Sequence, residues 1–143
     1  MKETLLTVLE NTRLADGIYR LRLTGDTSAI TAPGQFVNLK LSGFFLRRPI
    51  SVCDWENGEV TLIYKVLGHG TEAMTGMAVG TALDVLTGLG NGFDLSRSGE
   101  HPLLVGGGVG IPPLYGLGKR LTAQGKRVTA VLGFNRKSEI FLA

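Results

Sequence analysis

Residues 103–121 read Leu-Leu-Val-Gly-Gly-Gly-Val-Gly-Ile-Pro-Pro-Leu-Tyr-Gly-Leu-Gly-Lys-Arg-Leu and divide the chain in two. The apolar run 103–105 predicts a short buried strand, and the glycines after it allow the backbone to turn sharply. Pro112 and Pro113 suit the first turn of a helix, where a missing N–H is no loss, and leucines then recur at helical spacing. A strand, a glycine turn and a helix in this order are the start of a nucleotide-binding βαβ unit, in which the first N–H groups of the helix face a phosphate.

The glycine turn differs in spacing from two common phosphate-binding motifs. Ile111 stands where the Rossmann fingerprint has its third glycine, and no Gly-Lys-Ser or Gly-Lys-Thr follows, which argues against a P-loop. A tight strand-to-helix turn without a ligand is the alternative. The pattern Gly106-x-Gly108-x-Gly110-x-x-Pro113 resembles the pyridine-nucleotide motif of the ferredoxin-reductase superfamily. This resemblance implies that these three glycines and Pro113 shape the site of a nicotinamide nucleotide.

The composition excludes several classes of function. The 143 residues are 43% hydrophobic and 19% charged, which is enough apolar material for a core and too little charge for a disordered tail. The formal charge is +3 and the basic residues are scattered, so we expect no nucleic-acid partner, which would require a dense basic stripe. No apolar run reaches the length of a membrane span. The single cysteine, Cys53, excludes a disulfide framework and a cysteine-built metal site, and we expect a reducing, cytoplasmic location.

About six short strands are expected before the glycine turn. Residues 18–23 alternate, with Tyr19, Leu21 and Leu23 on one face, which predicts a half-buried strand. Turn signals such as Pro33-Gly34 separate this segment from the others. We therefore expect an antiparallel sheet or a small barrel. The expected strands lie near residues 4–11, 18–23, 35–41, 46–52, 60–67 and 81–86, and one or two helical turns near 71–74.

The segment after the glycine turn is expected to form only part of a second domain. The helix should end at Gly125, and residues 128–134 predict a second buried strand, parallel to the first. Residues 138–142 are expected to begin another helix, and the last apolar residues have no visible packing partner. The sequence therefore predicts a β + α/β fold, with a six-stranded antiparallel barrel over 1–99 and the first part of a Rossmann-like domain over 100–143. Because this second domain is incomplete, we expect either a fragment or a partner chain that completes it.

Two adjacent arginines, Arg47 and Arg48, follow an apolar patch at 44–46. In an alternating strand they face opposite ways, so only one of them shares a side with Leu46. An arginine near an apolar wall is costly unless an anion pairs with it, and a planar guanidinium matches a phosphate in a two-point contact. The alternative is an edge strand with solvated charges that Pro49 protects. The residues alone leave both readings open.

Five motifs in a fixed order resemble the electron-transfer subunits of the class 1B dihydroorotate dehydrogenases, which are ferredoxin-reductase-like flavoproteins. The likeness extends from Pro33-Gly34-Gln35-Phe36 to Gly133-Phe134, and it implies an FAD-binding barrel. The motifs are Leu46-Arg47-Arg48-Pro49-Ile50-Ser51-Val52, Ile63-Tyr64-Lys65, Gly68-His69-Gly70-Thr71, Leu89-Gly90-Asn91-Gly92-Phe93 and the glycine turn from Gly106 to Pro113.

The resemblance implies a role for each residue of the first of these motifs. Arg48 would pair with the FAD pyrophosphate. Pro49 and Ile50 would set the strand against the flavin. Ser51 would place its hydroxyl near the reactive edge of the isoalloxazine.

The next two motifs would complete the flavin site. Ile63, Tyr64 and Lys65 would line the cofactor, although Tyr64 taken alone fits core packing better. Gly70 and Thr71 would offer backbone N–H groups and a hydroxyl to the pyrophosphate. His69 reads as a loop residue, and the chain offers no paired carboxylate for acid–base work. We therefore assign the chain no catalytic residue and expect the flavin to carry the redox chemistry.

The resemblance also implies partners. NAD(H) would be exchanged as a substrate, and a catalytic dihydroorotate dehydrogenase subunit, within a heterotetramer, would oxidise dihydroorotate in pyrimidine biosynthesis. A [2Fe-2S] cluster on four cysteines would occur only in a full-length form, because this chain has Cys53 alone. Two alternatives are another ferredoxin–NADP reductase-like flavin oxidoreductase subunit and a non-catalytic docking module.

Overall fold

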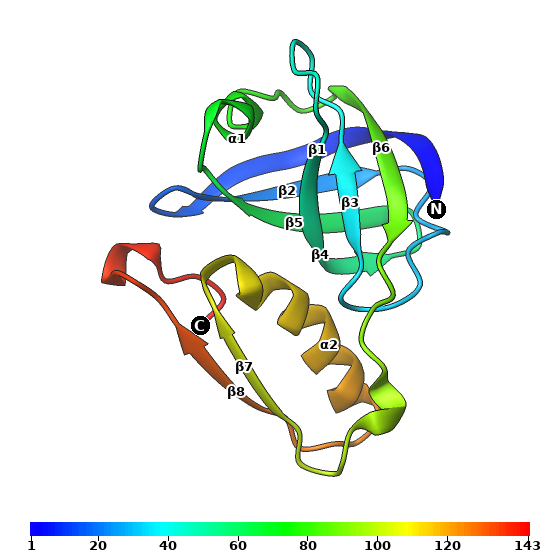
Figure 1. The fold of residues 1–143 in the computed structure, drawn as a ribbon, viewed down its shortest axis with the longest axis vertical. Coiled ribbons are helices and arrows are strands. Elements are labelled where there is room, and N and C mark those ends of the chain that lie inside the picture. Colours follow the sequence, from blue (N-terminus) through cyan, green and yellow to red (C-terminus); the bar gives the residue numbers. More distant parts are fainter.

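The computed structural model describes all residues, Met1–Ala143, and contains two layers of structure. A closed antiparallel barrel forms the upper layer in Figure 1, and a helix with a two-stranded parallel sheet forms the lower layer. All six strands expected before residue 105 are present, so the prediction of a barrel followed by an α/β segment is confirmed. The longest helix has 13 residues, and no helix is long and apolar enough to span a bilayer.

The barrel strands follow the order β1-β2-β5-β4-β3-β6 around the wall. A short helix, α1 (His69–Met74), covers one end of the barrel and includes the helical turns expected near 71–74. The strands are β1 (Lys2–Ala15), β2 (Ile18–Thr24), β3 (Phe36–Leu39), β4 (Arg48–Glu56), β5 (Glu59–Lys65) and β6 (Ala82–Leu89).

Alternation along the strands builds the barrel core. In β2, Leu21 and Leu23 are fully buried, as predicted for that face. Arg20 and Arg22 point outward, where both guanidinium groups contact Glu10, at 2.8 and 3.0 Å. The period-two pattern therefore separates an apolar interior from a charged outer wall, which is what stabilises a small barrel.

The chain leaves the barrel through a segment that is anchored at its start. The Phe93 N–H donates to the carbonyl oxygen of Pro33 at 2.7 Å, and the Gln35 side chain donates to the carbonyl oxygen of Gly90 at 3.1 Å. Gly34 has a φ of +94°, and a Cβ there would lie 2.8 Å from the Phe93 ring. The Pro33-Gly34 turn therefore holds the start of the connection, which continues through a 3₁₀ helix (Leu95–Arg97).

The second layer contains β7 (Leu103–Gly107), a 3₁₀ turn (Gly108–Gly110), α2 (Ile111–Ala123) and β8 (Thr129–Gly133). The two strands are parallel, as predicted. The expectation that both are buried is wrong, because α2 covers only one face of the pair. Leu104 faces α2 and is 9% exposed, whereas Leu103, Val105 and Val131 on the other face are 62%, 67% and 52% exposed.

The C-terminal segment differs from its prediction. Instead of a helix over 138–142, the chain forms one 3₁₀ turn (Lys137–Glu139) and continues irregularly. The Asp16 N–H donates to the carbonyl oxygen of Ser138 at 2.9 Å, which holds the segment on the barrel. Phe141 is 5% exposed and packs where the two layers meet, so the expectation that the last apolar residues lack packing partners is wrong for Phe141, whereas Ile140 and Leu142 remain exposed.

Candidate functional site

The two adjacent arginines have different surroundings. Arg47 lies on the outer wall, where its Nη2 is 3.0 Å from carboxylate oxygens of both Glu3 and Asp84. Arg48 makes no ion pair. The only hydrogen bond of its side chain within the protein goes to the Leu46 carbonyl oxygen, and its guanidinium lies 5.0 Å from the centre of the Phe44 ring. Arg48 is therefore the arginine whose charge is left free for an anion.

Helix α1 approaches Arg48 at a glycine. Gly70 is buried, and a Cβ at this position would collide with the Arg48 guanidinium. The structure thus brings together two residues that the sequence assigned to one phosphate site. The Thr71 hydroxyl has a structural use, since it accepts the N–H groups of Leu67 at 2.8 Å and Gly68 at 3.2 Å.

Beside the motif that begins at Arg48, the hydrogen-bonded ladder of the closed barrel has an opening between β4 and β5. The β4–β5 ladder ends at the pair Val52–Leu62. Beyond that pair the first part of β4 pairs only with β3, and the last part of β5 pairs only with β2. Pro49, Ile50 and Ser51 therefore lie on one side of the point where the strands part, and Ile63, Tyr64 and Lys65 lie on the other.

The three predicted residues of β5 point in different directions. Tyr64 lies inside the barrel, where its hydroxyl donates to Asn11 Oδ1 at 2.9 Å and its ring stacks on Tyr19. Burial raises the pKa of Tyr64 well above its ordinary value. Ile63 packs between the layers in the cluster of Ile111 and Phe141. At these two positions only the backbone is available to a cofactor, whereas the Lys65 side chain is partly exposed.

Of the three predicted glycines in the glycine turn, one is packed and two are open. A Cβ at Gly106 would lie 2.5 Å from the Leu114 side chain, so glycine allows α2 to pack on β7. At Gly108 and Gly110 a Cβ would meet nothing within 4 Å, and Gly108 has a φ of +53°. No side chain caps α2, and its first turn, which contains Pro113, has no acidic residue. Pro112 and Pro113 have no N–H group, and the Ile111 N–H donates to the carbonyl oxygen of Gly108. An anionic ligand at this turn would therefore meet the open backbone at Gly108 and Gly110 and not the N–H groups of the first helical turn.

A cleft of about 560 Å³ touches one residue of each predicted set. It lies where the end of β5 meets the carboxyl ends of β7 and β8, which is where α/β sheets bind ligands. Lys65 and Gly108 both line it, and Lys65 Nζ is 3.6 Å from a carboxylate oxygen of Glu139. The other predicted residues do not line it. The lining residues are Ile18, Lys65, Leu67, Gly107, Gly108, Val109, Gly133, Phe134, Asn135, Glu139 and Phe141.

Glu139 and Phe141 were missed as site residues. The helix that was expected over 138–142 gave no reason to place either residue beside Lys65. Gly133 and Phe134 end a strand that the sequence predicted. Because ligands bind at the carboxyl ends of parallel strands, this position could have identified Phe134 as a site residue.

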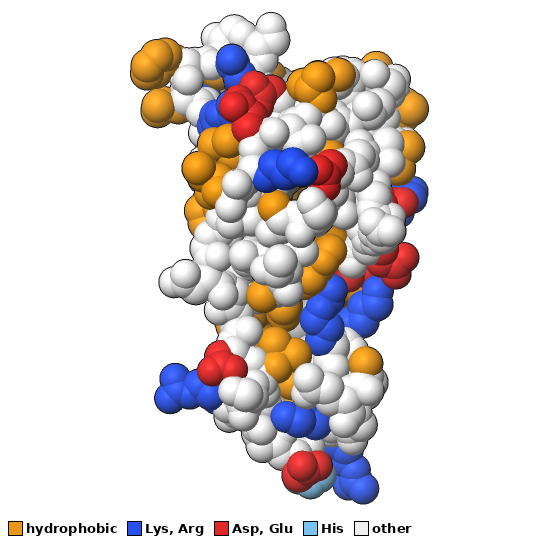
Figure 2. Space-filling view, turned by 90° about the vertical axis from the view of Figure 1, so that its right-hand side faces the viewer, with side chains coloured by type: hydrophobic (Ala, Val, Ile, Leu, Met, Phe, Trp, Pro, Cys, Tyr) orange, Lys and Arg blue, Asp and Glu red, His pale blue; other side chains and the backbone are white.

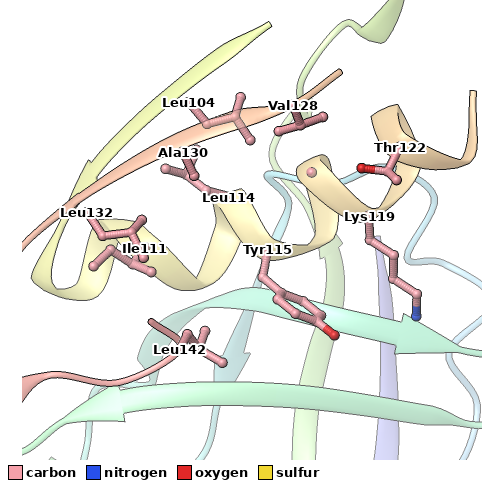
Figure 3. A pocket seen from close by; sticks show the side chains of 11 residues that line it. Leu104, Ile111, Leu114, Tyr115, Lys119, Thr122, Val128, Ala130, Leu132 and Leu142 are labelled. Carbon is pink, nitrogen blue, oxygen red and sulfur yellow. The ribbon is translucent and has the colours of Figure 1, made fainter. Parts of the chain in front are cut away.

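A separate pocket of about 400 Å³ lies between α2 and β8 (Figure 3). It is lined mostly by apolar side chains, such as Leu114 and Leu132, and contains none of the predicted site residues. In Figure 3, Tyr115 and Lys119 point away from the parallel sheet and toward the barrel. Helix α2 therefore has one face on its own sheet and another on the barrel.

The charged groups outside the cleft are mostly paired. Hydrogen bonds from Thr12 and from Arg22 and Arg20 lower the pKa of Glu10 from 4.5 to about 2. Burial, with a smaller effect of the adjacent carboxylate, raises the pKa of the Cys53 thiol to about 12. Charges of both signs are spread over the face in Figure 2, and no three His, Cys, Asp or Glu side chains are grouped as a metal site.

Comparison with known proteins gives consistent matches. No family model matches the chain. The electron-transfer subunit of dihydroorotate dehydrogenase B (NAD(+)) from Bacillus pumilus is 46% identical over 99% of this chain and 58% of that protein. The subunit of the same name from Listeria innocua is 42% identical over the same shares. The chain thus spans about 58% of the length of these curated relatives.

Solved structures agree on the fold. An NADH-dependent reduced ferredoxin–NADP oxidoreductase superposes with a TM-score of 0.87 and 30% identity, over 98% of this chain and 52% of that one. A cytochrome P450 reductase from Amycolatopsis superposes with a TM-score of 0.88 at 24% identity, over 99% and 46%. The chain therefore has the fold of ferredoxin-reductase-like FAD- and NAD-binding proteins and is homologous to dihydroorotate dehydrogenase electron-transfer subunits.

Proposed function

We propose that this chain, a homologue of dihydroorotate dehydrogenase electron-transfer subunits, is the FAD-binding part of a subunit that passes electrons between NAD(H) and a dihydroorotate-oxidising partner. The observation that carries the proposal is Arg48, a guanidinium without a carboxylate partner that touches α1 at Gly70. Such a guanidinium can bind a phosphate through two parallel hydrogen bonds. Its strand, β4, leads from there to the opening in the barrel wall.

The residues present fit FAD. Arg48 offers the fork of donors that a pyrophosphate accepts, and nothing in the chain competes for its charge. The cleft of about 560 Å³ is within the range of small-molecule sites, and of the proposed flavin residues only Lys65 lines it, so Arg48 would hold the pyrophosphate outside this cleft. When bound, FAD would supply hydride and single-electron transfer.

The chain's own residues would bind and orient the two nucleotides. Ser51 would offer a hydroxyl from the β4 side of the opening, and Pro49 and Ile50 would hold that segment of strand against the flavin. Gly70 would let Arg48 reach the pyrophosphate, with Thr71 fixing the turn that presents Gly70. Lys65 would face the cleft from β5, beside backbone contacts from Ile63 and Tyr64.

The nicotinamide nucleotide would bind at the glycine turn. Gly108 and Gly110 would present open backbone, Gly106 would let α2 pack close to β7, and Pro113 would stiffen the first helical turn. This arrangement divides the chain into a barrel domain, 1–99, and the nucleotide-binding segment, 100–143.

Assignments for the whole protein come from its curated relatives, of whose length this chain spans about 58%. We propose a catalytic dihydroorotate dehydrogenase subunit as partner, a heterotetramer, and a cytoplasmic role in pyrimidine biosynthesis. We assign a [2Fe-2S] cluster to a full-length form only, because Cys53 is the one cysteine here and it is buried.

A second candidate is a ferredoxin–NADP reductase-like subunit, favoured by the 30% identity to the NADH-dependent ferredoxin–NADP oxidoreductase. Anaerobic reduction assays discriminate the two. Co-expression with the dihydroorotate-oxidising subunit of the same genome should give dihydroorotate-dependent flavin reduction, whereas a ferredoxin reductase would respond to reduced ferredoxin instead.

The first experiment is to purify the chain, record its visible absorption, and identify any released cofactor by mass. We expect a yellow protein that releases FAD and that NADH bleaches in the absence of oxygen. A folded but colourless protein that does not take up added FAD would contradict the proposal and favour a docking module.

A further inference from the structure

The two layers meet where α2 crosses β4, and the closest approach is at a glycine. Gly116 is buried in the middle of α2, and a Cβ there would lie 2.7 Å from the carbonyl oxygen of Cys53. Real Cβ atoms essentially never come so close to another heavy atom. Because the obstacle is a backbone oxygen in the centre of a strand, it cannot rotate away as a flexible side chain would.

Contacts on both sides of Gly116 hold the helix in this position. One turn toward the C-terminus, Lys119 Nζ lies 2.8 Å from Asp54 Oδ2. Arg120 stacks with its Cζ 3.5 Å from the centre of the Trp55 ring. At the N-terminal end of the helix, Ile111 packs in a cluster with Cys53 and others. The helix is therefore fixed along a stretch of β4 and not at a single point.

The same two elements carry the two proposed nucleotide sites. Strand β4 begins with Arg48, and Ser51 precedes Cys53 by two residues. Helix α2 begins directly after Gly110 of the glycine turn. The path from the flavin segment to the nicotinamide segment thus runs through β4, the Gly116 contact and α2.

We infer that Gly116 is a positioning residue, which sets the separation between the flavin segment of β4 and the glycine turn that begins α2. The inference rests on the proposed function and adds a residue that touches neither nucleotide. An alanine at position 116 must move by about 0.7 Å to change 2.7 Å into the 3.4 Å of ordinary contact. A misplacement of about 1 Å can cost on the order of 100-fold in rate, so we expect Gly116→Ala to slow flavin reduction about tenfold.

Gly118 provides a matched control two residues away on α2. A Cβ at Gly118 would lie 3.4 Å from Leu104 and 3.8 Å from Val128, which is ordinary contact on the face opposite the barrel. Both substitutions replace a helical glycine by alanine and so carry the same gain in helix propensity. They differ only in the surface they meet.

The test compares the two variants in the full chain, loaded with FAD and mixed anaerobically with NADH. We expect Gly116→Ala to keep its FAD content and its half-saturating NADH concentration while the limiting reduction rate falls about tenfold. Its long-wavelength charge-transfer absorbance, which depends on flavin–nicotinamide overlap, should weaken as well. Gly118→Ala should match the wild type. A Gly116→Ala protein with wild-type rate and absorbance would overturn the inference, whereas a wild type that binds no FAD would instead overturn the proposed function.

A second variant covers the case in which Gly116→Ala does not fold. Lys119→Met removes the ion pair with Asp54, together with a longer contact to Glu56 at 3.4 Å, but leaves the apolar stem and the Gly116 contact in place. Without any cofactor, amide exchange along α2 should become about two- to fivefold faster, in line with the loss of one such pair. Unchanged exchange in α2 would show that these contacts do not hold the helix on β4, and would overturn the inference.

Discussion

Replacement of Arg48 by alanine is the sharpest test of the flavin site. Arg48 has no carboxylate partner, so its removal leaves no buried charge unpaired and should change stability little. The lost contact would be with the pyrophosphate. A hydrogen bond to a charged group contributes about 1.5–3 kcal/mol, which corresponds to roughly 10- to 150-fold weaker FAD binding.

Arg47 is the matched control, because it is the same residue type one position earlier. Its guanidinium bridges Glu3 and Asp84 and donates to the carbonyl oxygen of Asp84 at 3.2 Å. Arg47→Ala should therefore lower the stability of the barrel but leave FAD affinity unchanged. Arg48→Lys should fall between wild type and Arg48→Ala, since it keeps the charge and loses the planar fork.

Titration of FAD into the apoprotein, followed by calorimetry or by quenching of flavin fluorescence, gives the dissociation constants, and urea unfolding gives the stabilities. An Arg48→Ala variant that binds FAD as tightly as the wild type would refute a pyrophosphate contact by Arg48. An Arg47→Ala variant that loses as much affinity as Arg48→Ala would refute it as well, because the two side chains would then not differ in role.

Three further predictions concern groups outside the cleft. A hydrogen bond from Thr12 is the largest cause that lowers the pKa of Glu10 from 4.5 to about 2, so the carboxylate stabilises the fold above pH 4.5 and this contribution is lost as the pH falls toward 2. Glu10→Gln should therefore have a lower urea midpoint than the wild type at pH 7, and the difference between the two midpoints should shrink in acid. A difference that does not depend on pH would contradict this. Tyr64→Phe should lower the free energy of unfolding by about 1 kcal/mol through the lost bond to Asn11 without changing FAD affinity, and weaker FAD binding would show that the hydroxyl has a second role. The Cys53 thiol, with its pKa raised to about 12 by burial, should not react with a disulfide reagent at pH 8 until the protein is unfolded, and rapid labelling of the native protein is the opposing result.

The barrel could be predicted from the sequence because its signals are local. Alternation in β2 identified Leu21 and Leu23 as core, and the turn at Pro33-Gly34 separated the strands. The glycine turn and the two prolines located the start of α2. In each case a few neighbouring residues carry the physical reason for the structure.

The remaining features depend on contacts between distant segments. The residues alone did not decide whether the arginines form an anion site or are solvated charges, and only the family resemblance indicated Arg48. The difference between Arg47 and Arg48 depends on Asp84 and Gly70, which lie far along the chain. Apolar runs such as 103–105 imply burial on both faces, but the sequence does not show that α2 covers only one. The fold of the C-terminal segment onto the barrel at Phe141 had no local signal.

The approach of Gly116 to a main-chain oxygen also has an evolutionary consequence. Clashes between two side chains can be relieved when the partner becomes smaller, and cores therefore drift by paired substitution. Every amino acid at position 53 carries the same carbonyl oxygen, so no change there can make room for a side chain at position 116. As long as the two layers keep this spacing, glycine at position 116 should persist without a covarying partner, whereas position 118, on the opposite face of the helix, should accept alanine among relatives.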